Sequence, residues 1–236
     1  PSIKLLMANK LGESLAVSRL LEFTSNEELK LLDFEDGVSD RTLNRTLERM
    51  GKNSPFVIDK YQQWVKKNKL EDNTQNVDFS SSYFEGNNCS LAKLGYSRDH
   101  EPGKPQITYG ISIGANKMPT ALTIQKGNVN DRKHMKTMLK LCTKILTPSS
   151  LLVFDCGGNT KQNKETIRKL GFHYLTLRGK KTGPYKEAIA FFKSASQQKI
   201  ETNGAEVLCA KRGKNGEHQY VFYSEKLARD QLAKKG

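Results

Sequence analysis

The chain has 236 residues, of which 39 are Lys or Arg and 25 are Asp or Glu, so its formal net charge is +14. A hydrophobic fraction of 36%, with 10 Phe and 8 Tyr, excludes wholesale disorder, and no apolar run is long enough to span a bilayer. The charge favours a polyanionic partner such as nucleic acid, although a basic protein without such a partner would have the same composition.

Residues 1–72 are expected to form a helical domain that could bind DNA. Apolar residues recur at helical spacing in SLAVSRLLEF, VSDRTLNRTLERMG and SPFVIDKYQQWVKKNKL. In a helix-turn-helix, the second of these helices would offer Arg41 and Arg45 to a DNA groove. An ordinary helical domain with a solvated basic face explains the pattern equally well.

Residues 73–180 are expected to form an α/β core, beginning after the polar break EDNTQN. The segments VDFSSSYF, QITYGISIG and PTALTIQKG predict three strands, and a helix is expected over residues 131–146. SSLLVFD and FHYLTLR predict two more strands on either side of the helix TKQNKETIRKLG. An antiparallel start followed by right-handed crossovers gives a ribonuclease-H-like mixed sheet.

Residues 181–236 follow a looser pattern. KKTGPYKEAIAFFKSASQQKIE is basic and partly helical, and AEVLCAKRGKNGEHQYVFYS predicts a hairpin. The last piece, SEKLARDQLAKKG, predicts a charged helix.

Two carboxylates stand where such a sheet forms ligand sites. Asp155 follows the buried strand LLVF at its carboxyl end, and Asp78 lies between Val77 and Phe79, so its side chain points away from both. Each aspartate alone has a simpler explanation, as a turn residue or a strand acid. If the first and fourth strands are neighbours, however, the two converge, and a divalent cation offsets their repulsion. Paired carboxylates that hold Mg²⁺ suit phosphoryl transfer.

Four ordered motifs resemble DDE transposases of bacterial and archaeal insertion sequences. VDFSSSYFEG is similar to the D-x-T-S-x-Y-F-E-G signature around the first aspartate, and LGYSRDHEPGKPQ is similar to G-Y-S-R-D-x-R-P-D-x-P-Q. IQKGNVNDRKHM resembles the P-G-N-x-x-D stretch, and LLVFDCGGNT takes the place of V-x-A-D-R-G-M around the second aspartate. The match covers roughly residues 75–180, whereas residues 1–70 share only a helical character.

This resemblance implies a ribonuclease-H-like core that cleaves and joins double-stranded DNA at insertion-sequence ends. It implies two Mg²⁺ (or Mn²⁺) ions held by two aspartates and a glutamate, and a homodimer on DNA. Asp78 and Asp155 match the two aspartates as catalytic residues and metal ligands.

The third acidic residue of the family lies on a late helix, in a Y-x2-R-x3-E-x6-K pattern that residues 181–236 do not contain. Glu206, Glu217 and Glu225 fall where the family has a β-rich insertion. The resemblance therefore predicts that residues 181–236 are the start of that insertion. The chain is expected to be a piece of a longer transposase or the product of a decayed element.

Three further cations are candidates for contacts with nucleic acid: Lys93, Arg98 and Lys126. Solvated loop charges are the alternative explanation for them. Asn128 and Asp131 would either orient the metal ligands through contacts with them or cap the following helix. Capping fits Asp131 because it begins that helix. His134 is expected at the surface of the helix.

Three functions stay open: a DDE transposase, a catalytically incomplete DNA-binding remnant of one, and an unrelated metal nuclease on the same fold. The 4 cysteines are widely spaced and include no CxxC pair, which favours reduced thiols over structural zinc. With no signal-peptide pattern, we expect a prokaryotic cytoplasmic protein that associates with the nucleoid and has no membrane partner.

Overall fold

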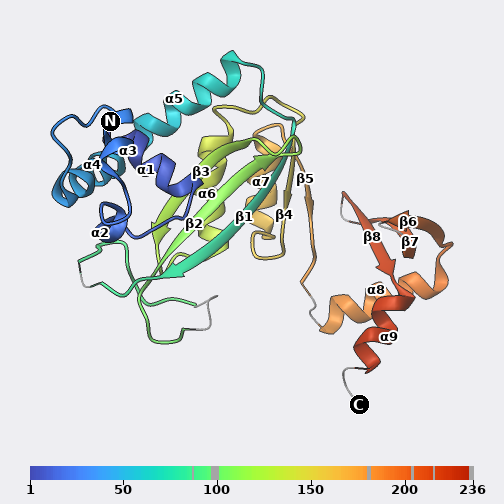
Figure 1. Ribbon diagram of the computed structural model, residues 1–236. Helices are drawn as coiled ribbons and strands as arrows, with labels where there is room; N and C mark the ends of the chain where they lie inside the picture. The colour runs from blue at the N-terminus through green and yellow to red at the C-terminus, as the bar shows by residue number, and fades with distance from the viewer. Residues whose placement is uncertain (87, 97–100, 180–181, 203–204, 215, 234–236) are drawn as a thin grey trace. The chain divides into compact units, whose positions relative to one another are not determined.

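The protein is described by a computed structural model that covers all residues except 87, 97–100, 180–181, 203–204, 215 and 234–236 (Figure 1). It divides into two compact units, Pro1–Leu177 and Arg178–Gly236. The first unit contains helices followed by a large sheet, and the second contains a small sheet with its own helices.

Helices fill the region before the first strand: α1 (Ser2–Leu11), α2 (Val17–Leu20), α3 (Asn26–Leu31), α4 (Asp40–Lys52) and α5 (Ser54–Lys67). A small apolar core joins α1 to α4 and is built from Leu5, Leu6, Leu20, Leu29 and Leu43. The helix predicted at SLAVSRLLEF is only the short α2. The hydroxyl of Thr24 donates to the backbone oxygen of Leu20 at 2.7 Å, which satisfies a carbonyl that a longer helix would use.

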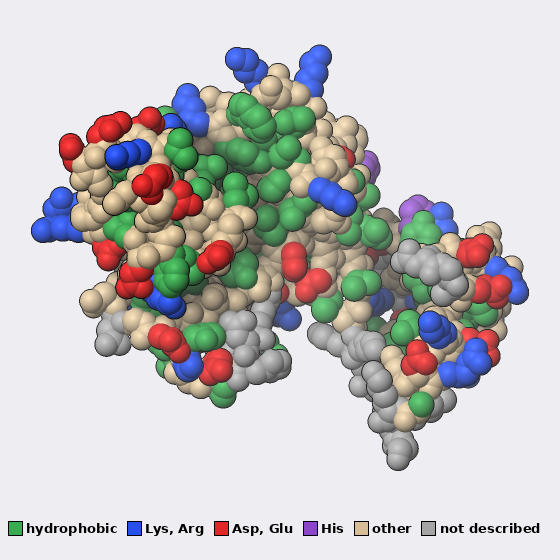
Figure 2. Space-filling model, in the orientation of Figure 1, with side chains coloured by type: hydrophobic (Ala, Val, Ile, Leu, Met, Phe, Trp, Pro, Cys, Tyr) green, Lys and Arg blue, Asp and Glu red, His purple; other side chains and the backbone are tan. Residues whose placement is uncertain are grey.

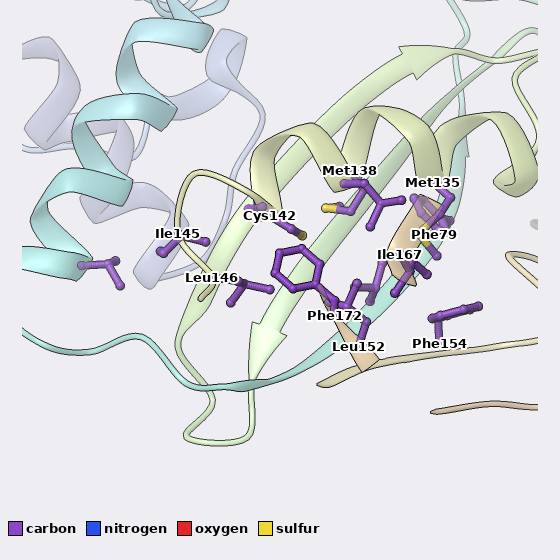
Figure 3. Packing of buried hydrophobic residues seen from close by; sticks show 14 residues of the cluster. Phe79, Met135, Met138, Cys142, Ile145, Leu146, Leu152, Phe154, Ile167 and Phe172 are labelled. Atoms are coloured by element: carbon purple, nitrogen blue, oxygen red, sulfur yellow. The ribbon is translucent and has the colours of Figure 1, made fainter. Parts of the chain in front are cut away.

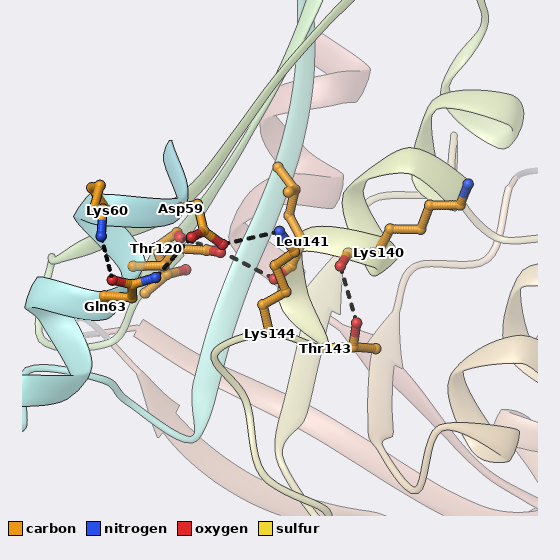
Figure 4. Close-up of polar contacts among 9 residues, drawn as sticks. Asp59, Lys60, Gln63, Thr120, Lys140, Leu141, Thr143 and Lys144 are labelled. Atoms are coloured by element: carbon orange, nitrogen blue, oxygen red, sulfur yellow. Dashed lines mark hydrogen bonds and ion pairs between the residues drawn. The ribbon is translucent and has the colours of Figure 1, made fainter. Parts of the chain in front are cut away.

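Helix α5 packs against strand β3 (Pro119–Lys126) of the large sheet described below and against the end of helix α6 (Asp131–Cys142) (Figure 4). The amide Nε2 of Gln62 donates to the backbone oxygens of Thr120 at 2.9 Å and Leu141 at 3.2 Å. An ion pair of 3.1 Å between Lys144 Nζ and Asp59 Oδ1 lies at the same junction. These side-chain contacts anchor the helical region to the core that follows it.

The large sheet has five strands within the described residues: β1 (Thr74–Tyr83), β2 (Gln106–Gly114), β3 (Pro119–Lys126), β4 (Leu151–Phe154) and β5 (His173–Thr176). Their order is β3-β2-β1-β4-β5. The β3–β2 and β2–β1 pairs are antiparallel, whereas β1–β4 and β4–β5 are parallel. Helices α6 (Asp131–Cys142) and α7 (Lys161–Lys169) supply the crossovers. The predicted ribonuclease-H-like mixed sheet is therefore confirmed.

Helices α6 and α7 cover one face of the large sheet (Figure 1) and form its core (Figure 3). The buried side chains include Phe79, Met135, Met138, Leu152, Phe154, Ile167 and Phe172. Burial of each large apolar side chain stabilises the fold by about 1.5–3 kcal/mol. The helix predicted over residues 131–146 ends at Cys142, and the turn after it carries Ile145 and Leu146 into this core.

The opposite face of the large sheet, called the open face below, keeps apolar side chains in contact with solvent. Strand alternation turns Tyr109, Leu122, Ile124 and Leu175 to this face, and they are 37–52% exposed. Figure 2 shows hydrophobic side chains gathered over the sheet. Asp78, in the middle of β1, shares the open face with them.

The second unit contains a small antiparallel sheet of order β6-β7-β8, formed by β6 (Gln198–Thr202), β7 (Ala205–Lys214) and β8 (Glu217–Tyr223), with helices α8 (Thr182–Ser194) and α9 (Glu225–Ala233). The predicted hairpin and final helix are present. Helix α8 packs against the small sheet through Phe192, whose ring centroid lies 6.1 Å from that of Tyr223. None of the helices in the described ranges combines the length and apolar character that crossing a bilayer requires.

Candidate functional site

The register of the large sheet brings Asp78 and Asp155 together. Strands β1 and β4 are parallel neighbours in which Val77 stands opposite Phe154, so the next position along each strand is an aspartate. Neighbouring strands lie about 4.8 Å apart. Val77 and Phe79 are buried, and Asp78 between them is exposed. Asp155, immediately after β4, is exposed as well.

A backbone amide holds each of these carboxylates. Asp78 Oδ1 accepts a hydrogen bond from the N–H of Phe79 at 2.8 Å, and Asp155 Oδ1 accepts one from the N–H of Gly157 at 2.9 Å. The backbone oxygen of Asp155 also accepts from the hydroxyl of Thr176 in β5 at 2.9 Å. Since a carboxylate has about four lone-pair sites, each aspartate is oriented while it retains acceptor capacity for a further ligand.

The two glycines after Asp155 are explained by close contacts. A Cβ on Gly157 would overlap Asp131 Oδ2 and lie 3.1 Å from Asp155 Oδ1. A Cβ on Gly158 would lie 2.8 Å from Cε of Met135, in the core. Glycine at these positions therefore lets the Asp155 turn approach both the Asp131 carboxylate and helix α6.

Asp131 stands beside Asp155 and does not cap α6. The cap is Asn130, whose side-chain oxygen accepts from the N–H of Lys133 at 3.2 Å, so the expected capping role of Asp131 is wrong. Sequence alone did not separate the two because both residue types favour this position. Asp131 is the first residue of the helix, where a negative charge is favourable. Asn128, its predicted companion, is exposed in the preceding loop.

A buried amide joins the Asp155 turn to the start of α6. Asn163 Nδ2 donates to the backbone oxygens of Gly158 at 2.9 Å and Arg132 at 3.2 Å. This residue is not predictable from the sequence, because nothing in its local pattern distinguishes it from a surface position of α7. Asn163 fixes the turn that presents Asp155.

His134 is buried, and the expectation that it lies at the surface is wrong. Its Nε2 lies 2.8 Å from the hydroxyl of Thr123, and its ring centroid lies 4.8 Å from that of Phe79. The signal was present in the sequence, since Met138 lies one helical turn further along the same buried side of α6. Through Phe79, this histidine packs against the buried face of β1, one residue after Asp78.

The donor set at Asp78 and Asp155 fits a hard divalent cation. Mg²⁺ prefers oxygen ligands and is commonly bound by one or two carboxylates while it keeps several waters. Within the ranges that the structure describes, no group of three His, Cys, Asp or Glu side chains is arranged to hold a metal ion. Glu206, Glu217 and Glu225 belong to the second unit, on β7, β8 and α9.

The candidate cations for contacts with DNA are solvent-exposed where they are described. Lys93 lies in the segment paired with the start of β2, and Lys126 ends β3. Arg41 and Arg45 are exposed one helical turn apart on α4. Arg98 lies outside the described residues.

Gly157→Ala is expected to weaken binding of Mn²⁺ about tenfold, because the new Cβ displaces the Asp131 and Asp155 carboxylates. The Asp131 side chain can rotate away, so the cost in unfolding free energy is only about 1 kcal/mol. Calorimetric titration of Mn²⁺ measures the first effect and thermal unfolding the second. Gly179→Ala is the matched control because nothing lies within 4 Å of its Cβ position. Wild-type affinity in Gly157→Ala would contradict the proposed geometry.

No family model matches this sequence, and no curated protein matches it. Among solved structures, the chain is similar to piggyBac transposase in a synaptic complex with hairpin DNA, at 11% identity and a TM-score of 0.40 over 63% of this chain and 32% of that one. It is also similar to Mos1 transposase in a paired-end complex with the left transposon end, at 9% identity and a TM-score of 0.32 over 83% of this chain and 71% of that one. The chain spans about a third of the length of the piggyBac transposase chain.

Proposed function

We propose that this chain carries the metal-dependent core of a DDE-type DNA transposase, in which Asp78 and Asp155 are the catalytic metal ligands. The observation that carries the proposal is the juxtaposition of these two exposed carboxylates on neighbouring parallel strands. Of the four motifs that resemble insertion-sequence transposases, the two that match the family's aspartates select the same two residues.

In this proposal Asp78 and Asp155 would hold Mg²⁺ (or Mn²⁺), and a cation bound there would supply activation of a water or a 3′-hydroxyl and charge stabilisation for the leaving oxygen of a phosphodiester. The amides of Phe79 and Gly157 keep the Asp78 and Asp155 carboxylates in place. Preorganisation of this kind matters because phosphoryl transfer depends chiefly on positioning and electrostatic stabilisation. Asp131, beside Asp155, would orient groups around the same cation.

Double-stranded DNA is the proposed substrate, and a homodimer would bind it both as transposon end and as target. The proposed protein is prokaryotic and located in the cytoplasm. The +14 charge supports this choice, since each phosphate neutralised by a cation releases condensed counterions. Lys93 and Lys126 would contact phosphates near the core, and Arg41 and Arg45 would contact DNA from α4. Binding should therefore weaken steeply as salt concentration rises.

The test is a cleavage assay on plasmid DNA with the wild-type chain in Mg²⁺, Mn²⁺ or EDTA, together with calorimetric titration of Mn²⁺. The proposal expects nicks that need the cation, and products joined to target DNA. Nicking without joining favours a metal nuclease on the same fold. A third outcome is salt-sensitive DNA binding with neither nicking nor saturable binding of Mn²⁺. That outcome favours the DNA-binding remnant and overturns catalysis by this chain.

A further inference from the structure

The small sheet of the second unit has one covered and one exposed face. Helix α8 covers one face: Arg212 packs over the ring of Phe191 at 4.6 Å and pairs with Glu187 at 3.0 Å. Tyr223 lies on this covered face and contacts Phe192. The residues that alternate with them point to the other side of the sheet.

On that other side, β8 exposes three rings in a row. His218, Tyr220 and Phe222 occupy every second position, and all three are exposed; Tyr220 is 46% and Phe222 61% accessible. The Tyr220 and Phe222 rings are nearly parallel, at an interplanar angle of 16°, with centroids 6.4 Å apart. We call these three residues, together with Lys211, the aromatic face.

A cation sits among these rings. Lys211 pairs with Tyr220 across β7 and β8, and its Nζ lies 5.6 Å from the Tyr220 ring centroid. On β6, the residues of the same side include Gln198 and Ile200, both exposed. By strand alternation, the carboxylates Glu201, Glu206 and Glu217 are directed to the opposite side, and so are the cations Lys199 and Arg212. Lys211 is therefore the charge that the described strands place among these rings.

The second unit is also more basic than the rest of the chain. Residues 178–236 contain 13 Lys or Arg and 6 Asp or Glu, a net charge of +7, which is half of the +14 of the whole chain. Exposed aromatic rings without carboxylates, within a cationic unit, are complementary to a polyanion that carries flat apolar groups.

We propose that the aromatic face binds single-stranded nucleic acid, with unpaired bases stacked on Tyr220 and Phe222 and the backbone phosphate held by Lys211. Only unpaired bases expose their faces to such rings, because bases in a duplex are stacked on each other. Every base has a π-face, so this binding tolerates any sequence. The inference does not depend on Asp78 or Asp155, and it adds a second nucleic-acid site to the chain.

A second copy of the chain is the other possible occupant, and charge disfavours it. Two copies of the second unit, each of net charge +7, would repel each other if their aromatic faces met. A polyphosphate strand would instead neutralise the positive charge of the unit. The aromatic face is therefore assigned to nucleic acid, and self-association becomes an outcome of the test.

The test uses the full chain and a fluorescein-labelled oligothymidylate of about 16 nucleotides, with a duplex of the same length for comparison, by fluorescence anisotropy. The double variant Tyr220→Ala with Phe222→Ala is expected to weaken single-strand binding about a hundredfold and duplex binding less than about twofold. Tyr220→Phe keeps the ring and should keep the affinity. Lys211→Gln should weaken binding severalfold and reduce the salt slope by about one.

Matched controls separate stacking from general charge and hydrophobicity. Tyr185→Ala removes another exposed ring of the second unit, from α8, and Lys193→Gln removes another exposed charge of α8. Both should bind oligothymidylate like the wild type. Equal losses for single strand and duplex would overturn the inference. Wild-type affinity for oligothymidylate in the double variant would also overturn it. In that case, a dimer seen in sedimentation with the wild type and lost in the double variant would assign the aromatic face to self-association.

Discussion

Asp78→Asn and Asp155→Asn are each expected to abolish metal-dependent nicking, with a loss of at least about 10³-fold, equivalent to about 4 kcal/mol of transition-state stabilisation. Asparagine keeps the shape of the side chain and removes the negative charge that holds the cation. Binding to duplex DNA should be unchanged, because the DNA-contact cations are untouched. Both aspartates are exposed, so the free energy of unfolding should change by less than about 0.5 kcal/mol.

Three measurements check this result on the same preparations: plasmid nicking, calorimetric titration of Mn²⁺, and DNA binding by anisotropy. The matched control is Asp36→Asn, which makes the same substitution at an exposed aspartate in the loop before α4. The control should nick DNA at the wild-type rate. If both site variants retained nicking, Asp78 and Asp155 could not be the metal ligands and the proposed mechanism would fail.

The sequence was sufficient to predict this pair because each residue sits in a strong local pattern. Val77 and Phe79 fix the direction of Asp78 by alternation, and the apolar run before Asp155 marks the end of a buried strand. Connection rules alone do not fix which strand lies beside β4, so the sequence predicts convergence only on the condition that the first and fourth strands are neighbours. The sheet order β3-β2-β1-β4-β5 meets that condition.

Contacts between residues of different elements could not be predicted from local patterns and connection rules. His134 belongs to the core because its ring meets Phe79 from another element, and Asn163 because its amide reaches two backbone oxygens across a turn. Strand β6 was not predicted because all of its residues are exposed, so its sequence carries no alternating pattern. In all three cases, the burial or secondary structure of the segment depends on the elements that it pairs with or packs against. The sequence of one segment does not show which elements those are.

Gly127→Ala is expected to destabilise the first unit by about 3 kcal/mol, which for a unit of this size lowers Tm by roughly 6–12 °C. Gly127 is buried where the end of β3 meets the segment before β2: its N–H donates to the Leu91 oxygen at 3.0 Å, and its oxygen accepts from Gln106 Nε2 at 3.0 Å. A Cβ would overlap the backbone oxygen of Gln106 and lie 2.5 Å from that of Lys93.

Backbone atoms cannot rotate away as a side chain can, so this substitution must separate β3 from the Lys93 segment or shift the start of β2. Gly51→Ala is the matched control: its Cβ position on α4 has nothing within 4 Å, and alanine in a helix should raise stability by up to about 1 kcal/mol. Thermal and urea unfolding of the two variants give the comparison. Equal stability would mean that the Lys93 segment does not pack on Gly127. Since that segment carries a cation proposed to contact DNA, Gly127→Ala should also weaken duplex binding, whereas Gly51→Ala should not.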